Sequence, residues 1–354
     1  MPIWKRYFYK EYLSSILFIL LAIYGLYITV DAMVHLDLIA ANPSLKYWSA
    51  YYFASFSKRL DVLVPFAILL ATIRTLTNMQ SRGELVAMLV GGVSRKALLG
   101  PFCMIACCFT LLLYINYQWF LPDAVHTIEA LELVKPHKAE KSSERCGPKE
   151  IMLEDGSKIV YASFSPEERT FCDLFWIASA NKLFYMKSLS LKEKTPVGYW
   201  VEHILRAQSG SLEKIASFEK FEFKKMIISE EALKNSVTPT NELSLGALAR
   251  QASIYFKSSA PKAAEIKTYL LHHLTFPWMC LLVCMVPAPF CLRFSRQEPL
   301  FIIYLLAIAA LFAQNLIIQG ALVLGKYGAV PAPLAMSFPW IVACSIFGKK
   351  YVDL

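Results

Sequence analysis

The chain has 354 residues, of which 56% are hydrophobic, and its mean hydropathy is +0.44. A soluble domain is typically about 45–50% apolar, so the composition excludes an ordinary soluble protein and favours a membrane protein. The formal net charge is +9, but no basic stripe on a folded domain accompanies it, so the charge does not indicate nucleic-acid binding.

Apolar runs along the chain predict six membrane helices. A helix needs about 20 residues to cross the hydrocarbon, and uncharged runs at or near this length occupy 12–30, 97–122, 268–292, 299–325 and 327–348. A sixth candidate, 50–76, is interrupted by charges, but Trp48, Tyr51 and Tyr52 before it suit a membrane interface. The first run is long and lacks a small-residue cleavage site, so we expect an uncleaved helix rather than a signal peptide.

The segment 123–267 differs from both flanks. It holds 21 Lys or Arg and 20 Asp or Glu, which predicts a nearly neutral soluble domain between a first membrane half, 1–122, and a second, 268–354. An Asp155-Gly156 turn between β-prone runs predicts a hairpin.

Two further stretches in this segment, DLFWIASANKLFYMKSLSLKEK and FEKFEFKKMII, also have the character of strands. Residues 124–134 and 243–259 predict helical connectors to the membrane halves. The predicted fold is an α-helical membrane protein with six transmembrane helices, three before and three after an inserted, mostly β domain.

The basic residues of the membrane halves predict the orientation. Eleven lie on one side: Lys5, Arg6, Lys10, Arg74, Arg82, Arg95, Lys96, Arg293, Arg296, Lys349 and Lys350. Four lie on the other: Lys46, Lys58, Arg59 and Lys326. The positive-inside rule then places both termini in the cytoplasm and the inserted domain outside.

The stretch SRGELVAMLVGG, residues 81–92, lies between the second and third apolar runs. It is too apolar for an ordinary loop and too short to cross a bilayer. Ser81 and Glu84 have the spacing of a capping box, which predicts a helix start. Gly91-Gly92 predicts the stop, and Ser94 can cap the helix that follows. The sequence therefore predicts a short cytoplasmic helix tied to two membrane helices.

Leu85, Met88 and Leu89 share one face of this helix. Two interpretations remain open: an amphipathic helix on the lipid surface, or a helix that enters the groove of a cytoplasmic partner such as a transport ATPase. In the second case the coupling residues are Ser81, Arg82, Glu84, Leu85, Met88, Leu89 and Gly92.

No enzyme signature is present. GALVLGKY at 320–327 nearly matches a P-loop, but Tyr327 replaces the required hydroxyl and the segment is expected in an outer loop rather than after a strand. There is no H-E-x-x-H or G-x-S-x-G motif. We therefore predict no catalytic residue, metal or cofactor.

Histidines and cysteines also give predictions. We expect His272 and His273 near the outer interface, although ionisable residues within a membrane are often functional. Seven cysteines lie in or beside apolar runs, where packing is the simplest role. Cys146 and Cys172 fall in the inserted domain, where a disulfide is one of two open alternatives.

Charged and polar residues at the helices give two candidate substrate regions. Lys58 and Arg59 lie about 24 Å along a helix from Arg74, at the depth of the outer headgroups. Snorkelling would explain them, and contact with an anionic amphiphile is the alternative. Asp31, His35 and Asp37 lie at a similar depth. Gln314, Asn315 and Gln319 interrupt the fifth apolar run, where hydrogen bonds between helices or contact with a substrate cavity are both open.

Three segments carry a resemblance to a known family. They are RYFYKEYL from residue 6, KRLDVLVPFAILLATIRTLTNMQSRGELVAMLVGGVSRKAL from residue 58, and GKYGAVPAPLAMSFPWIV from residue 325. With these segments the chain resembles the LptF/LptG permeases, membrane subunits of the lipopolysaccharide exporter of Gram-negative bacteria. The spacing of Lys58 before Pro65 is more similar to LptG than to LptF.

The resemblance implies specific partners and a mechanism. Such a subunit would pair with its paralogue, LptF if this chain is LptG-like, on an LptB-type ATPase dimer. Residues 81–92 would be the coupling helix. The inserted domain would be a β-jellyroll that passes lipopolysaccharide to an LptC-type periplasmic protein, and the first and fifth helices would line the lateral gate. The alternatives are a permease for another lipid or lipoprotein exporter, and a membrane-anchored envelope scaffold.

Overall fold

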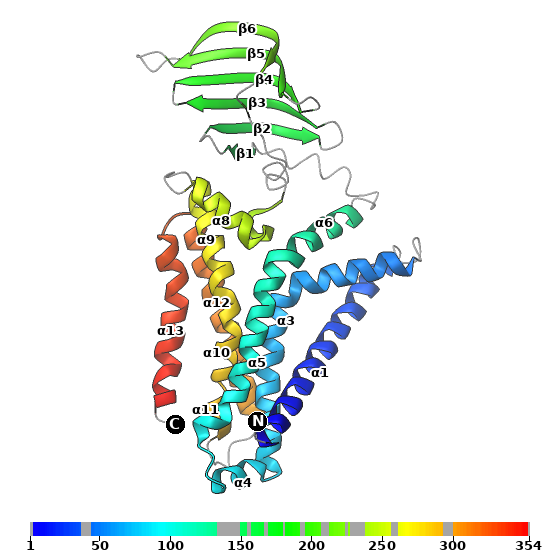
Figure 1. The fold of residues 1–354 in the computed structure, drawn as a ribbon, viewed down its shortest axis with the longest axis vertical. Helices are drawn as coiled ribbons and strands as arrows, with labels where there is room; N and C mark the ends of the chain where they lie inside the picture. Colours follow the sequence, from blue (N-terminus) through cyan, green and yellow to red (C-terminus); the bar gives the residue numbers. More distant parts are fainter. Residues whose placement is uncertain are drawn as a thin grey trace. The chain divides into compact units, whose positions relative to one another are not determined.

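The computed structural model describes residues 3–36, 44–132, 149–153, 157–165, 169–179, 181–191, 195–206, 212–223, 226, 238–255, 261–292 and 300–352 (Figure 1). The chain forms two compact units. The helical unit contains Met1–Leu131, Ser244–Leu248 and Ser259–Leu354. The β unit contains Glu132–Leu243 and Ala249–Ser258.

Helices follow the apolar runs of the sequence. The first membrane half contains α1 (Ile3–Val34), α3 (Leu45–Ser81), α4 (Glu84–Val90), α5 (Arg95–Ile115), the π-helix η1 (Asn116–Phe120) and α6 (Leu121–Glu132). After the β unit come η2 (Thr240–Glu242), α8 (Leu245–Ile254), α9 (Pro261–Thr275), the 3₁₀ turn η3 (Phe276–Trp278), α10 (Met279–Met285), α11 (Ala288–Leu292), α12 (Leu300–Lys326) and α13 (Ala332–Val352). The predicted connectors at 124–134 and 243–259 are confirmed as α6 and α8.

Five helical stretches are long and apolar enough to cross a membrane, and a shorter apolar stretch, Ala332–Ile346, follows them in α13. The five are Trp4–Val34, Leu45–Ser81, Ala97–Val125, Lys262–Cys291 and Leu300–Lys326. They match the predicted runs in order. Within the helical unit, Figure 1 shows that the start of α1, the end of α13 and the short α4 lie at the same end.

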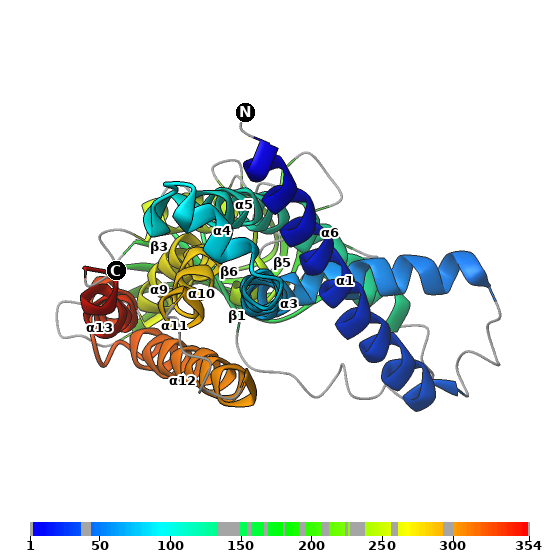
Figure 2. The same ribbon diagram turned by 90° about the horizontal axis from the view of Figure 1, so that it is seen from below.

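The core of the helical unit is built around α3. Large buried side chains such as Phe8, Tyr12 and Phe102 pack against its middle section, and the Tyr12 hydroxyl lies 2.9 Å from the Thr72 hydroxyl. Seen from below in Figure 2, α3 lies between α1 and α12. These two helices are the least covered of the apolar stretches, with 11% and 17% of their most apolar windows buried.

The strands of the β unit are β1 (Lys149–Met152), β2 (Lys158–Ser165), β3 (Thr170–Ser179), β4 (Lys182–Ser190), β5 (Val197–Arg206) and β6 (Leu212–Glu222). They form one antiparallel sheet in sequence order, consistent with the expected mostly β, jellyroll-like domain. The predicted hairpin is confirmed by the pairing of β1 with β2, whereas its turn residues Asp155 and Gly156 lie outside the described residues.

A crease crosses the sheet from β2 to β6. Between β2 and β3, Tyr161 pairs with Leu174 and the next pair is Ser163 with Cys172, so one residue of each strand is skipped. One residue of each strand is skipped in the same way between β3 and β4, β4 and β5, and β5 and β6. The skipped residues are Ala162, Asp173, Lys187, Trp200 and Glu219, and all five are exposed. Two of them, Asp173 and Trp200, have positive φ angles of 48° and 53°.

This crease changes the alternation of side chains. In β3, Phe171 and Leu174 are buried while both residues between them are exposed. The register of each strand pair is the same on both sides of the crease, so it is not a β-bulge. The sheet carries an aromatic-rich core with members from most strands, including Tyr161, Trp176 and Met186.

Candidate functional site

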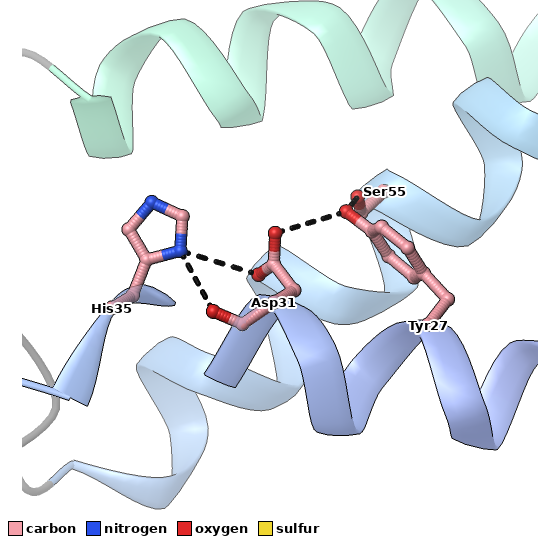
Figure 3. A network of polar contacts seen from close by, with 4 residues as sticks. All are labelled: Tyr27, Asp31, His35 and Ser55. Carbon is pink, nitrogen blue, oxygen red and sulfur yellow. Dashed lines mark hydrogen bonds and ion pairs between the residues drawn. The ribbon is translucent and has the colours of Figure 1, made fainter. Parts of the chain in front are cut away.

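One candidate site is a polar network where α1 faces α3 (Figure 3). Tyr27 and Asp31 are one turn apart on α1, and His35 follows one turn later. The Tyr27 hydroxyl donates to Asp31 Oδ1 at 3.2 Å and lies 3.0 Å from Ser55 Oγ on α3. His35 Nδ1 lies 3.5 Å from Asp31 Oδ2. The i, i+4 spacing thus gathers these groups on one helix face.

Arg59 joins this network through an aromatic ring. Its guanidinium carbon lies 4.2 Å from the centre of the Tyr27 ring, a cation–π distance. Within the described residues Arg59 forms no ion pair, and across the two helices it contacts the Tyr27 ring, whose hydroxyl donates to Asp31. The network therefore presents a cation that is positioned but not neutralised by direct contact.

The structure brings three of the predicted headgroup residues together: Asp31, His35 and Arg59. Lys58 lies next to Arg59 on α3 and is exposed, while Asp37 lies outside the described residues. Sequence reasoning missed Tyr27 and Ser55. The spacing of Tyr27 one turn before Asp31 was the available signal, whereas the contact with Ser55 depends on how α1 packs against α3.

An aromatic cluster extends from this network along α3. The rings of Trp48 and Tyr51 lie 5.7 Å apart, and Trp48 and Tyr52 lie 6.0 Å apart. The Tyr24 hydroxyl donates to the Tyr52 carbonyl. These are the residues expected at a membrane interface, where an apolar ring with a polar edge is favourable.

The second candidate site is α4, which is shorter than predicted. Ser81 is the last residue of α3, and its hydroxyl donates to the Asn78 carbonyl. Gly83 adopts φ +72° and is the N-cap residue of α4, without a side-chain hydrogen bond. The predicted capping box of Ser81 and Glu84 is therefore wrong. The physical reason is that a left-handed glycine ends α3 and starts α4 through the backbone alone.

The end of α4 agrees with the sequence prediction. Gly91 is its C-cap residue, and the amide of Gly92 donates to the Leu89 carbonyl. Gly92 has φ +87°. The Ser94 side chain then accepts a hydrogen bond from the Ala97 amide at 3.2 Å, so it caps α5 as predicted.

The apolar face of α4 is turned into this chain's own core. Leu85 is 1% exposed, and Met88 and Leu89 are half-buried against the same core. Leu85 is therefore not accessible to a partner, while the coupling role of Met88 and Leu89 stays a prediction. The exposed surface of α4 is carried by Ala87 and by Val90, whose side chain is 84% exposed.

Polar contacts tie α4 to the start of α1. The Tyr7 hydroxyl donates to Glu84 Oε1 at 3.3 Å, and Arg82 donates to the same hydroxyl at 3.3 Å. Arg82 and Glu84 form an ion pair at 3.8 Å. Arg82 and Glu84, on either side of Gly83, therefore bind α4 to the start of α1.

The predicted cavity residues of α12 have separate environments. Gln314 is buried, and its side-chain amide donates to the Pro339 carbonyl of α13 at 3.1 Å. It also lines an apolar cavity of about 10 Å³, which is too small for a lipid. Asn315 is half-buried, and Gln319 is exposed on the surface of α12. For Gln314, the interhelical hydrogen bond is therefore the observed role.

Other sequence expectations are settled by burial and secondary structure. His272 and His273 are 8% and 3% exposed; the His273 ring stacks on Tyr117 of η1 and the His272 ring lies 5.0 Å from Phe276, while their position at the outer interface stays a prediction. The segment 320–326 belongs to α12 rather than to an outer loop, which removes the loop that a P-loop needs. Cys172 is exposed, and because Cys146 lies outside the described residues, the disulfide stays a prediction.

Residues 6–348 match the family described as lipopolysaccharide export system permease LptF/LptG. A comparison with curated proteins gave no match. The family match spans both membrane halves and the inserted β unit, in agreement with the architecture of the structure. The chain belongs to the LptF/LptG permease family, and it is a multi-pass membrane protein of the kind that serves as the permease component of lipopolysaccharide export.

Proposed function

We propose that this chain extracts lipopolysaccharide from the outer leaflet of the inner membrane and passes it to a periplasmic partner, with a separate cytoplasmic ATPase supplying the energy. The single observation that carries the proposal is the amphiphilic character of α1 and its surroundings. An apolar helix with little of its surface covered ends in a network that holds the guanidinium of Arg59 against the Tyr27 ring.

This arrangement suits a lipid with an anionic headgroup. Exposed apolar side chains on α1, among them Leu17, Phe18 and Leu21, would contact acyl chains. Arg59, with Lys58 beside it, would contact phosphate, because a guanidinium forms paired hydrogen bonds with phosphate oxygens. Asp31, His35 and Asp37 would set the local charge around the headgroup.

The substrate cavity would form between two permease chains. α12 exposes a long apolar surface that includes Phe301, Leu305 and Leu316, and the polar Gln319 lies on this helix. With a paralogous permease opposite α1 and α12, Asn315 and Gln319 would face the enclosed space.

The ATPase would bind the exposed side of α4. Val90, Ala87 and the glycines at the two ends of α4 are accessible to a groove in a partner, while Leu85, Met88 and Leu89 anchor the helix to its own chain. Movement of the ATPase would then displace α4 together with α3 and α5. The β unit would receive the lipid and pass it to an LptC-type protein.

The headgroup proposal is tested with the full complex in proteoliposomes, containing the paralogous permease, the LptB-type ATPase and the LptC-type protein. Arg59→Gln should reduce the rate of ATP-dependent lipopolysaccharide extraction by about 5-fold or more, as loss of a charge-assisted phosphate contact predicts. Lys46→Gln is the matched control, since Lys46 is an exposed cation outside the network. Equal rates for the two variants would contradict the assignment.

A second measurement tests the cargo itself. Depletion of the protein in cells should cause lipopolysaccharide to accumulate in the inner membrane. Depletion without this accumulation would contradict the proposed function, and accumulation of a lipoprotein or another lipid instead would identify a different export substrate.

A further inference from the structure

Three consecutive residues of the π-helix η1 contact three different parts of the helical unit. A π-helix contains an extra residue relative to α-helical geometry, and it occurs frequently at functional sites because it is costly to keep. Here it interrupts the helical path from α5 into α6. Its side chains therefore need partners that stabilise the irregular turn.

Asn116 fastens η1 to α3. The Ser57 hydroxyl donates to Asn116 Oδ1 at 2.6 Å, and Asn116 Nδ2 donates to the Ser57 carbonyl at 3.0 Å. Both side chains are buried. In an apolar environment an unpaired amide is costly, so this pair of bonds fixes the position of η1 along α3.

Tyr117 fastens η1 to α9. Its ring stacks on His273 with 4.5 Å between ring centres and 16° between ring planes. Both residues are nearly inaccessible, with 3% of each exposed. This contact holds the His273 ring inside the helical unit.

Gln118 fastens η1 to the start of α8. Its side-chain Oε1 accepts a hydrogen bond from the Gly246 amide at 2.9 Å. A Cβ added to Gly246 would lie 3.1 Å from the Gln118 side-chain nitrogen, so the glycine permits this close approach. α8 belongs to the chain segment that returns from the β unit, whereas α6 begins the segment that enters it.

The helix that faces η1 is also irregular at this level. α9 gives way to the 3₁₀ turn η3, which contains Pro277. The Thr110 hydroxyl donates to the Pro277 carbonyl at 3.2 Å, and the Tyr114 hydroxyl donates to the Leu274 carbonyl at 2.5 Å. The stretch from α5 to α6 and the stretch from α9 to α10 are thus both irregular at this level. Hydrogen bonds from Thr110 and Tyr114 join them there. A 3₁₀ stretch inside a helix often marks a hinge.

We propose that Asn116–Phe120 is a hinge that moves both connections of the β unit together when the membrane helices move. This inference rests on the proposed function, because lipid transport is the process in which the membrane helices would move. Asn116 and Tyr117 would transmit the displacement of α3 and α9 to η1. Because η1 continues into α6, its displacement would move α6, which leads to the β unit. The hydrogen bond between Gln118 and Gly246 would move α8, which leads back from the β unit, in the same direction.

The first experiment removes the Gln118 contact in the full complex. Gln118→Ala should abolish the protection of the Gly246 amide in hydrogen–deuterium exchange. It should also slow lipid transfer to the periplasmic partner by about 5-fold or more, within the range of coupling free energies between sites. ATPase activity and lipid binding should be unchanged, because Gln118 touches neither the exposed side of α4 nor the network at Tyr27.

Two matched variants sharpen this test. Gln118→Glu keeps the acceptor oxygen and should restore both the protection and the transfer rate. Trp119→Ala truncates the exposed neighbour in the same π-helix and should behave as wild type. Loss of amide protection in Gln118→Ala without any change in transfer would overturn the hinge.

The second experiment removes the π turn. Deletion of Trp119 takes out the extra residue and should leave an α-helical path that binds lipid but transfers it slowly. Deletion of Ser142, between α6 and β1, shortens the chain equally and should leave the transfer rate unchanged. Wild-type transfer after deletion of Trp119 would overturn the hinge, and if this variant does not assemble, the Gln118 series decides.

These outcomes are distinguishable from failure of the proposed function. If the wild-type complex moves no lipopolysaccharide, the proposed function is wrong, whatever the variants do. If the wild type moves lipid and the Gln118 and Trp119 variants match it, only the hinge is wrong.

Discussion

Gln314 of α12 donates a hydrogen bond to the backbone carbonyl of Pro339 in α13, with 3.1 Å between the two atoms. The sequence makes this side chain a candidate for substrate contact, and in the structure it joins two helices. Within an apolar environment such a bond stabilises a helix pair modestly, by about 0.6 kcal/mol on average.

Gln314→Leu should therefore lower the free energy of unfolding in detergent by about 0.5–1.5 kcal/mol. Gln319→Leu is the control, because Gln319 is exposed on the same helix and should leave stability unchanged. A larger loss for the exposed position would contradict the packing of α12 against α13.

Leu85 and Val90 should separate stability from partner binding. Leu85→Ala removes a fully buried side chain from the core and should destabilise the chain by about 2–5 kcal/mol. Val90→Asp places a charge on the exposed side of α4 and should change stability by less than about 0.5 kcal/mol. In a pull-down, Val90→Asp should lose the ATPase while the protein stays folded, and retention of the ATPase by this variant would contradict the proposed docking side.

Gly325 allows α12 to approach α9 closely. A Cβ added there would lie 2.7 Å from Thr268 Cγ2 and 2.9 Å from its Oγ1, so Gly325→Ala should destabilise the chain by about 1–3 kcal/mol. The double variant with Thr268→Ala should recover part of this loss, measured as a double-mutant cycle. Gly320→Ala, with no atom within 4 Å of the added group, should cost nothing.

Ser157 and Trp176 form a buried hydrogen bond in the β unit. The indole Nε1 donates to Ser157 Oγ at 3.0 Å. Ser157→Ala leaves the indole N–H without this acceptor and should destabilise the β unit by about 1–3 kcal/mol. Limited proteolysis within 149–226 measures the effect, and adding Trp176→Phe, which removes the donor, should cost less than the two single changes summed.

The membrane helices were predictable because hydrophobic length is a strong and local signal. Each of the six apolar runs corresponds to a helical stretch, and the two connectors were also found. The capping box was misread because Ser81, Gly83 and Glu84 carry two competing signals. A Ser-x-x-Glu spacing predicts a start at Ser81, but the backbone freedom of Gly83 decides where α3 ends.

Side-chain neighbours across helices were not predictable from one sequence. The burial of Leu85 and of the two histidines depends on which helix lies opposite, and periodicity identifies a face without saying what covers it. In the β unit, the alternation of apolar and polar residues predicts the strands, but two consecutive residues face outward at the crease and the alternation shifts by one residue there. Asp173 and Trp200 each follow another outward residue, so a strict two-residue period assigns one side of the crease to the wrong face.

The crease also restricts how this sequence can change in length. Its skipped residues occupy matching positions in five neighbouring strands, β2 to β6. Deleting the skipped residue from a single strand would remove one of its two consecutive exposed residues. The rest of that strand would then shift by one residue in register relative to both neighbouring strands. Insertions and deletions in evolution should therefore collect in the hairpin loops, while the lengths of the five strands change only in concert.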